Sequence, residues 1–72
     1  MSKVPDLSHQ RILRALGRAG FVVIRQGKHI SMYSEERRVV ATIPRHSPVK
    51  RLTLARILKE IDMSVEEFLE LL

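Results

Sequence analysis

The residue with the clearest chemical potential is His29, which lies two positions after Gly27 in the basic stretch RQGKHISMY, residues 25–33. An imidazole titrates near neutral pH, so it can act as a general base or a general acid. The neighbouring cations Arg25 and Lys28 would attract an anionic ligand. A lone histidine on a strand is more often an ordinary surface residue, so the pattern alone leaves both interpretations open.

A second group of candidate residues lies further along the chain. His46, beside Arg45 in the segment PRHSP, could contact an anionic ligand or act as a second proton donor, or it could simply belong to a loop. Three more cations stand near the start of a predicted helix, namely Lys50, Arg51 and Arg56. The dipole of a helix also favours phosphate at this end. We interpret these cations as a phosphate clamp, and the alternative is a solvated helix face.

Two other side chains are weaker candidates. Tyr33 is the only tyrosine and could stack on a nucleobase, although packing across neighbouring strands would explain it equally well. His9 falls in the first turn of a predicted helix and is interpreted as a surface residue.

The charge of the chain is unevenly distributed. Residues 60–72 hold five acids and no base, whereas residues 1–59 hold all thirteen Lys and Arg against three acids, a net charge of +10. A body of this charge favours a polyanionic partner, because each cation placed against a phosphate releases condensed counterions. Nine of the thirteen bases are arginines, whose planar guanidinium binds phosphate in a bidentate manner.

The length and composition limit the classes of protein. The 72 residues suffice for one domain, residues 1–72, which must use nearly all of its apolar positions to build a core. No stretch approaches the apolar length of a membrane span, and the first ten residues lack the apolar core of a signal peptide, so we expect a cytoplasmic protein. With no cysteine and three scattered histidines, we expect no metal site and no cofactor.

The first helix is predicted from its apolar spacing and its ends. Ser8 can cap a helix in which Ile12, Leu13 and Leu16 repeat at helical spacing, and Gly20 is placed as its C-terminal stop. Three short segments then favour strands: FVVIRQ at 21–26, HISMY at 29–33 and RVVATI at 38–43. Because tight turns join them, we expect an antiparallel meander.

The C-terminal part of the chain is predicted to be helical. After two prolines, apolar residues recur at i, i+3, i+4 and i+7 at positions 54, 57, 58 and 61. Ser64 and Glu67 form a capping box that opens a short last helix, whose apolar residues are Phe68, Leu69 and Leu72. The slightly favoured interpretation is that this tail completes the core while its charges are solvated.

The predicted fold class is α+β, with the order α-β-β-β-α and a short C-terminal helix. Two helices bury their apolar stripes only by packing on one face of the three-stranded antiparallel sheet, which leaves the other face open. Ile30 and Met32 share one parity in the second strand, and His29, Ser31 and Tyr33 share the other. If the apolar pair faces the helices, His29 points outward.

The ordered set of motifs resembles the HicA family of toxins from bacterial and archaeal toxin–antitoxin pairs. The resemblance extends from Ser8 to Leu72 and rests on four motifs: Gly20-Phe21 after the first helix, Gly-x-His at 27–29, Ile-Pro-x-His at 43–46, and the Thr-Leu of the second helix with its SVEEFLELL end. It implies a fold like that of double-stranded-RNA-binding domains. It also implies an mRNA interferase that cleaves mRNA without the ribosome and is suppressed by a HicB antitoxin.

The resemblance places the catalytic histidine at His29. RNA carries its own nucleophile, the 2′-hydroxyl, so cleavage needs a general base and positive charge around the reacting phosphate. The cations and His46 then become candidates for RNA binding: Arg25, Lys28, Arg45, His46, Lys50, Arg51 and Arg56. The implied partners are mRNA and a HicB-like antitoxin protein, with no membrane and no metal.

Two hypotheses remain after the sequence has been considered. The first is a metal-independent endoribonuclease toxin that acts through His29. The second is a non-catalytic RNA-binding module of the same fold, which would recognise duplex or structured RNA by its shape and backbone. Both require arginines and an exposed sheet face, so the sequence does not separate them.

Overall fold

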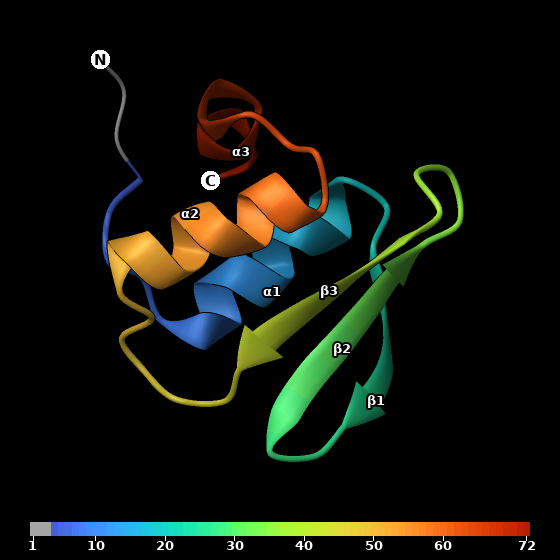
Figure 1. Cartoon of the computed structure of the whole chain (residues 1–72), viewed down its shortest axis with the longest axis horizontal. Helices are drawn as coiled ribbons and strands as arrows, with labels where there is room; N and C mark the ends of the chain where they lie inside the picture. The colour runs from blue at the N-terminus through green and yellow to red at the C-terminus, as the bar shows by residue number, and fades with distance from the viewer. Residues whose placement is uncertain (1–3) are drawn as a thin grey trace.

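The computed structural model describes residues 4–72. Residues 1–3 lie outside the described part; they belong to the first ten residues, in which no signal peptide is expected. Six elements follow one another along the chain (Figure 1): α1 (His9–Arg18), β1 (Val22–Gln26), β2 (His29–Ser34), β3 (Val39–Pro44), α2 (Arg51–Glu60) and α3 (Val65–Leu71). The predicted α+β class and element order are confirmed. Among residues 4–72, no helix combines the length and apolar character that a membrane crossing requires.

The three strands form the expected antiparallel meander in the order β1-β2-β3. Six successive residue pairs join β2 to β3, from His29 opposite Pro44 to Ser34 opposite Val39. The pairing of β1 with β2 contains an irregularity between Val23 and Arg25. This irregularity shifts the register of the strand that carries Arg25.

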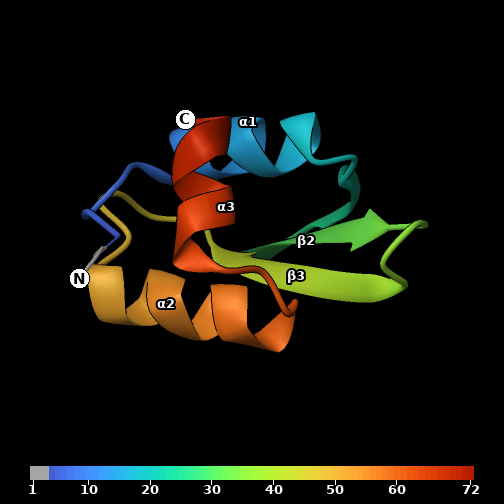
Figure 2. The same cartoon turned by 90° about the horizontal axis from the view of Figure 1, so that it is seen from above.

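The helices cover one face of the sheet and approach it at β3. Figure 2 shows α3 between α1 and α2, and both α1 and α2 contact β3. Alternate residues of β2 and β3 are buried, while all five residues of β1 are exposed. The buried hydrophobic residues form one cluster: Val4, Leu7, Ile12, Ala15, Leu16, Phe21, Ile30, Met32, Ala41, Ile43, Val49, Leu54, Ile57, Leu58, Ile61, Met63 and Phe68.

The ends of α1 agree with the sequence prediction. The Ser8 hydroxyl accepts a hydrogen bond from the Arg11 amide at 3.3 Å, as an N-cap side chain does. Gly20 has φ +96°, a left-handed conformation that favours glycine. The helix therefore ends before Gly20, as predicted, and the chain turns there to enter β1.

The start of α3 follows half of the predicted capping box. The Ser64 hydroxyl accepts from the Glu67 amide at 3.0 Å, but the Glu67 carboxylate pairs with Arg37 in the β2–β3 turn. The core contribution of this tail also differs from the prediction, because Leu72 is exposed while Leu71 packs against the core beside the fully buried Phe68. A helix of two turns has too few apolar residues to fix which of its sides faces the core, so Leu71 and Leu72 could not be told apart from the sequence.

Candidate functional site

The open face of the sheet carries His29. Along β2, Ile30 and Met32 are buried, whereas His29 is exposed and Ser31 and Tyr33 are partly exposed. Side chains of a strand alternate between its two faces, so these three residues form an outward row. The predicted parity of β2 is therefore confirmed.

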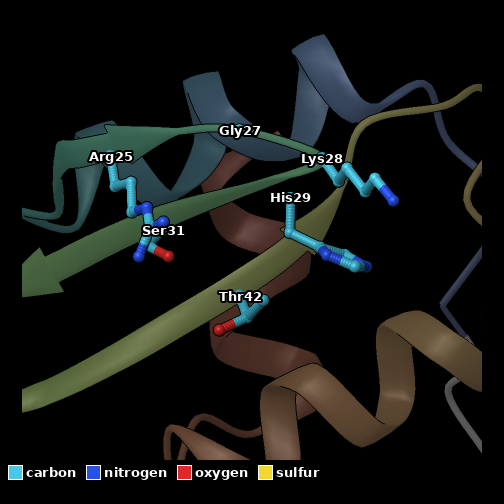
Figure 3. Close-up of a pocket in the computed structure, with 6 residues that line it drawn as sticks. All are labelled: Arg25, Gly27, Lys28, His29, Ser31 and Thr42. Carbon is cyan, nitrogen blue, oxygen red and sulfur yellow. The ribbon is translucent and has the colours of Figure 1, made fainter.

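A β-bulge brings Arg25 to the same face. Regular pairing continued from Val23 opposite Met32 would place Arg25 opposite the buried Ile30. The bulge inserts one extra residue, so that Arg25 instead lies opposite Ser31. Because residues directly opposite each other in a sheet share a face, Arg25 extends to the side of Ser31, as Figure 3 shows.

These residues line a shallow hollow on the sheet. Its lining comes from the end of β1, the turn, the outward row of β2 and one residue of β3, namely Arg25, Gly27, Lys28, His29, Ser31 and Thr42 (Figure 3). Thr42 lies opposite Ser31 in the β2–β3 register. The hollow thus combines an imidazole with two cations and two hydroxyl groups.

A third cation reaches the rim of the hollow from β3. Since His29 lies opposite Pro44, the next residue, Arg45, leaves the sheet beside the β1–β2 turn. Its Nη1 donates to the Gly27 carbonyl at 3.5 Å, which is the outer limit of a hydrogen bond. Arg25 and Lys28 therefore line the hollow together with His29, Arg45 lies at its rim, and the exposed charges of all three are available to an anionic ligand.

The cations at the start of α2 form a separate group. Lys50, Arg51 and Arg56 are all exposed. The backbone of this helix end is already occupied, because the Asp6 Oδ1 atom accepts from the Arg51 amide at 2.7 Å. A phosphate bound here would contact the side chains of the cations, and at this amide it would compete with a carboxylate. The helix dipole alone did not reveal this cap, because Asp6 lies 45 residues before Arg51 in the chain.

The other two histidines occupy different surroundings. His46 is exposed in the loop after β3 and does not line the hollow. His9 is partly buried, and its Nδ1 lies 2.9 Å from the Ser47 hydroxyl, which also accepts from the His9 amide at 3.1 Å. His9 therefore ties the start of α1 to the β3–α2 loop, which is more than the plain surface position expected for it.

Several polar residues that line hollows were not among the site candidates from the sequence. The parity of β2 placed Ser31 on the outward face without naming it as a site residue, and Thr42 joins the hollow only through the register of β3. A row of arginines on α1, Arg11, Arg14 and Arg18, lines a second hollow with Leu72. Their spacing of three and four residues was the available signal, since such residues lie on one helix face.

The arrangement around His29 suits proton transfer next to a bound phosphate. An exposed imidazole can reach a substrate proton, the cations can hold a phosphodiester, and the hydroxyls can donate to its oxygens. Within residues 4–72, no group of three or more His, Asp or Glu side chains could hold a metal ion.

Comparison with known proteins identifies the family of the chain. The family model described as HicA toxin of bacterial toxin–antitoxin systems matches residues 10–63, three quarters of the chain. A search of curated proteins found no match, and neither did a search of solved structures. The matched region contains all three strands, α2, nearly all of α1, and every residue that lines the hollow at His29. This chain therefore belongs to the HicA toxin family of bacterial toxin–antitoxin systems.

Proposed function

We propose that the protein is a metal-independent endoribonuclease that cleaves mRNA with His29 as its general acid–base group. The single observation that carries the proposal is the hollow in which the exposed His29 lies among Arg25, Lys28 and two hydroxyl side chains. Membership of the HicA family, whose members are known as mRNA interferases, supports RNA as the substrate.

The reaction requires only groups that RNA and this hollow supply. His29 takes the proton of the ribose 2′-hydroxyl, the 2′-oxygen bonds to the adjacent phosphorus, and the bond from phosphorus to the 5′-oxygen breaks. The protonated His29 gives its proton to the leaving 5′-oxygen and returns to its neutral form, and the products are a 2′,3′-cyclic phosphate and a 5′-hydroxyl. Arg25, Lys28 and Arg45 stabilise the charge that develops on the phosphate oxygens.

The first test is expression of the protein without its partner. The wild type is expected to arrest growth and fragment mRNA, and His29→Ala is expected to lower the cleavage rate by about 10²- to 10⁴-fold, the usual contribution of a general base. Since His29 is exposed, the variant should keep its fold and its RNA binding. His9→Asn is the matched control, because it removes an imidazole that lies outside the hollow.

The chemistry of the new RNA ends distinguishes this mechanism from others. Fragments should carry a 2′,3′-cyclic phosphate and a 5′-hydroxyl, and cleavage should persist in EDTA. A 5′-phosphate would mean that water attacks the phosphorus, which contradicts the role given to His29. Equal cleavage by wild type and His29→Ala would also contradict it, whereas binding without cleavage by either would favour the non-catalytic RNA-binding module.

The cognate antitoxin, which membership of a toxin–antitoxin family implies, is proposed to be a HicB-like protein that covers the hollow at His29. An acidic or aromatic-rich surface would neutralise Arg25, Lys28 and Arg45 while it hides the imidazole. Co-expression should then block cleavage and protect the amides of residues 25–33 from hydrogen exchange. A complex that blocks cleavage but leaves this stretch exchanging as in the free protein would exclude inhibition by coverage.

A further inference from the structure

The open sheet face is organised in cross-strand rows. Next to His29 lies a polar row that consists of Arg25, Ser31 and Thr42, one residue from each strand. Two residues further along β2, Tyr33 lies opposite Val22 on one side and Val40 on the other. We call these last three residues the apolar row. Its distance from His29 along the strand is about 13 Å, at about 3.3 Å per residue.

The apolar row is exposed although its side chains are large. Val22 is 58% exposed and Val40 is 49% exposed, on either side of the partly exposed ring of Tyr33. The helices cover the opposite face, so none of the described residues buries this row. An aromatic ring set between two aliphatic side chains on a sheet is a surface on which a nucleobase can stack.

We propose that the apolar row is a nucleobase subsite, in which Tyr33 stacks on a base of single-stranded RNA whose backbone crosses the polar row toward His29. The inference rests on the proposed function and deepens it, because it names single-stranded RNA as the substrate class. The stacked base belongs to a nucleotide that neighbours the one being cleaved, since Tyr33 lies beyond the reach of the nucleotide at His29.

Charge and size both favour RNA as the occupant. The cations Arg25 and Lys28 lie at one end of the face, where the phosphates would run. Glu35 directly follows β2, two residues after Tyr33, so its exposed carboxylate lies at the other end of the face, where it repels phosphate. Partial desolvation of the phenol, and then this carboxylate, raise the pKa of Tyr33. The apolar row consists of only three side chains, whereas a stable protein interface buries about 800 Å² on each partner. A single base fits the area of the row, but a second copy of the chain would require a larger area.

Tyr33 provides its own probe of the subsite. The chain has one tyrosine and no tryptophan, so the tyrosine emission of the protein reports on this ring alone. Stacking on a base is expected to quench the emission. The ligand for the experiment is a short single strand of 2′-O-methyl RNA, which lacks the nucleophile and therefore stays intact with the wild-type protein. A strand of the same length with abasic residues and inorganic polyphosphate are the backbone controls.

We expect quenching by the base-bearing strand and none by the abasic strand or by polyphosphate. Tyr33→Leu should weaken binding of the single strand roughly 5- to 150-fold, the usual effect of losing one stacked base, while Tyr33→Phe should bind as the wild type does. Duplex RNA should bind Tyr33→Leu and the wild type equally. Loss of binding by both variants would assign the effect to the hydroxyl and would overturn the stacking role.

The result separates this inference from the proposed function. If the wild type cleaves RNA but its emission is unchanged by the bound 2′-O-methyl strand, the subsite is wrong and the nuclease stands. If the emission is quenched but no RNA is cleaved, the subsite stands and the nuclease is wrong. If the tyrosine emission per molecule changes with protein concentration in the absence of RNA, and sedimentation shows a doubled mass, the apolar row binds a second copy of the chain and the inference is overturned.

Discussion

Replacing Arg25 with glutamine is expected to reduce the salt dependence of RNA binding by one phosphate contact. Three cations line or border the hollow that contains His29, namely Arg25, Lys28 and Arg45. If each of them neutralises one phosphate of a single strand, the affinity falls about 18-fold between about 50 and 200 mM salt, a logarithmic slope of about 2.1. Without Arg25, the slope should be about 1.4 and the loss about 7-fold.

The slope also decides whether the cations at the start of α2 belong to the same interface. If Lys50, Arg51 and Arg56 bind phosphates of the same strand, the wild-type slope should be about 4.2, and the affinity should fall about 340-fold over the same range of salt. Reversal of the charges of Lys50 and Arg51 together should then lower both the affinity and the slope. A wild-type slope near 2 would mean that the RNA contacts the cations of the hollow and not those at the start of α2.

The measurement is the fluorescence anisotropy of a labelled single strand of 2′-O-methyl RNA, titrated at several KCl concentrations. Arg14→Gln is the matched control, because it removes the same charge from the outer surface of α1, where Arg14 is exposed and lines a different hollow. The reasoning is refuted if Arg25→Gln keeps the wild-type slope, or if Arg14→Gln lowers the slope as much as Arg25→Gln does.

Four further outcomes test the fold and the site. Phe68→Ala should reduce the free energy of unfolding by about 3–5 kcal/mol in urea titrations, since the ring is fully buried, and Phe68→Leu should lose less. Asp6→Ala should lose about 1 kcal/mol in the same assay through loss of the α2 cap, whereas Asp6→Asn, which keeps an acceptor, should lose less. Gly27→Ala should change the unfolding free energy by less than about 0.5 kcal/mol, since an added Cβ would lie 4.0 Å from the His29 backbone oxygen. The same variant should weaken RNA binding, because Gly27 lines the hollow and the methyl group takes up space there; unchanged RNA binding would contradict this. Absorbance titration should show Tyr33 ionising above pH 10.0, and Glu35→Gln should lower the pKa of Tyr33. Because folding raises this pKa, the stability that Tyr33 contributes is complete below pH 10.0 and is lost as the pH rises through the pKa of the folded protein.

The parts of the fold that depend on local chemistry could be predicted from the sequence. Ser8 and Ser64 cap helices because a hydroxyl can accept from an amide two or three residues ahead. Gly20 ends α1 because its left-handed conformation suits glycine. The outward position of His29 followed from the alternation of β2. All of these depend on residues that are close together in the chain.

The features that the sequence did not reveal depend on contacts between distant segments. Asp6 caps a helix that begins 45 residues later, and His9 meets Ser47 across 38 residues. The Glu67 carboxylate pairs with Arg37 and not with the amide at the start of its own helix, because the β2–β3 turn lies beside α3. The bulge in β1 was equally hidden, since its position depends on how two strands are paired and not on the composition of either one. It determines the face on which Arg25 lies.

If the proposed RNA site is correct, the exposure of all of β1 separates residues that select RNA from residues that maintain the fold. None of its five side chains lies in the core, so most substitutions in this strand should change the unfolding free energy by only a few tenths of a kcal/mol. Mutations in β1 can therefore accumulate without unfolding the protein, and those at Val22 or Arg25 alter the apolar row or the polar row of the open face. Related toxins that diverge in this strand would acquire different RNA preferences on an unchanged scaffold, and each antitoxin that covers this face would have to change with its toxin.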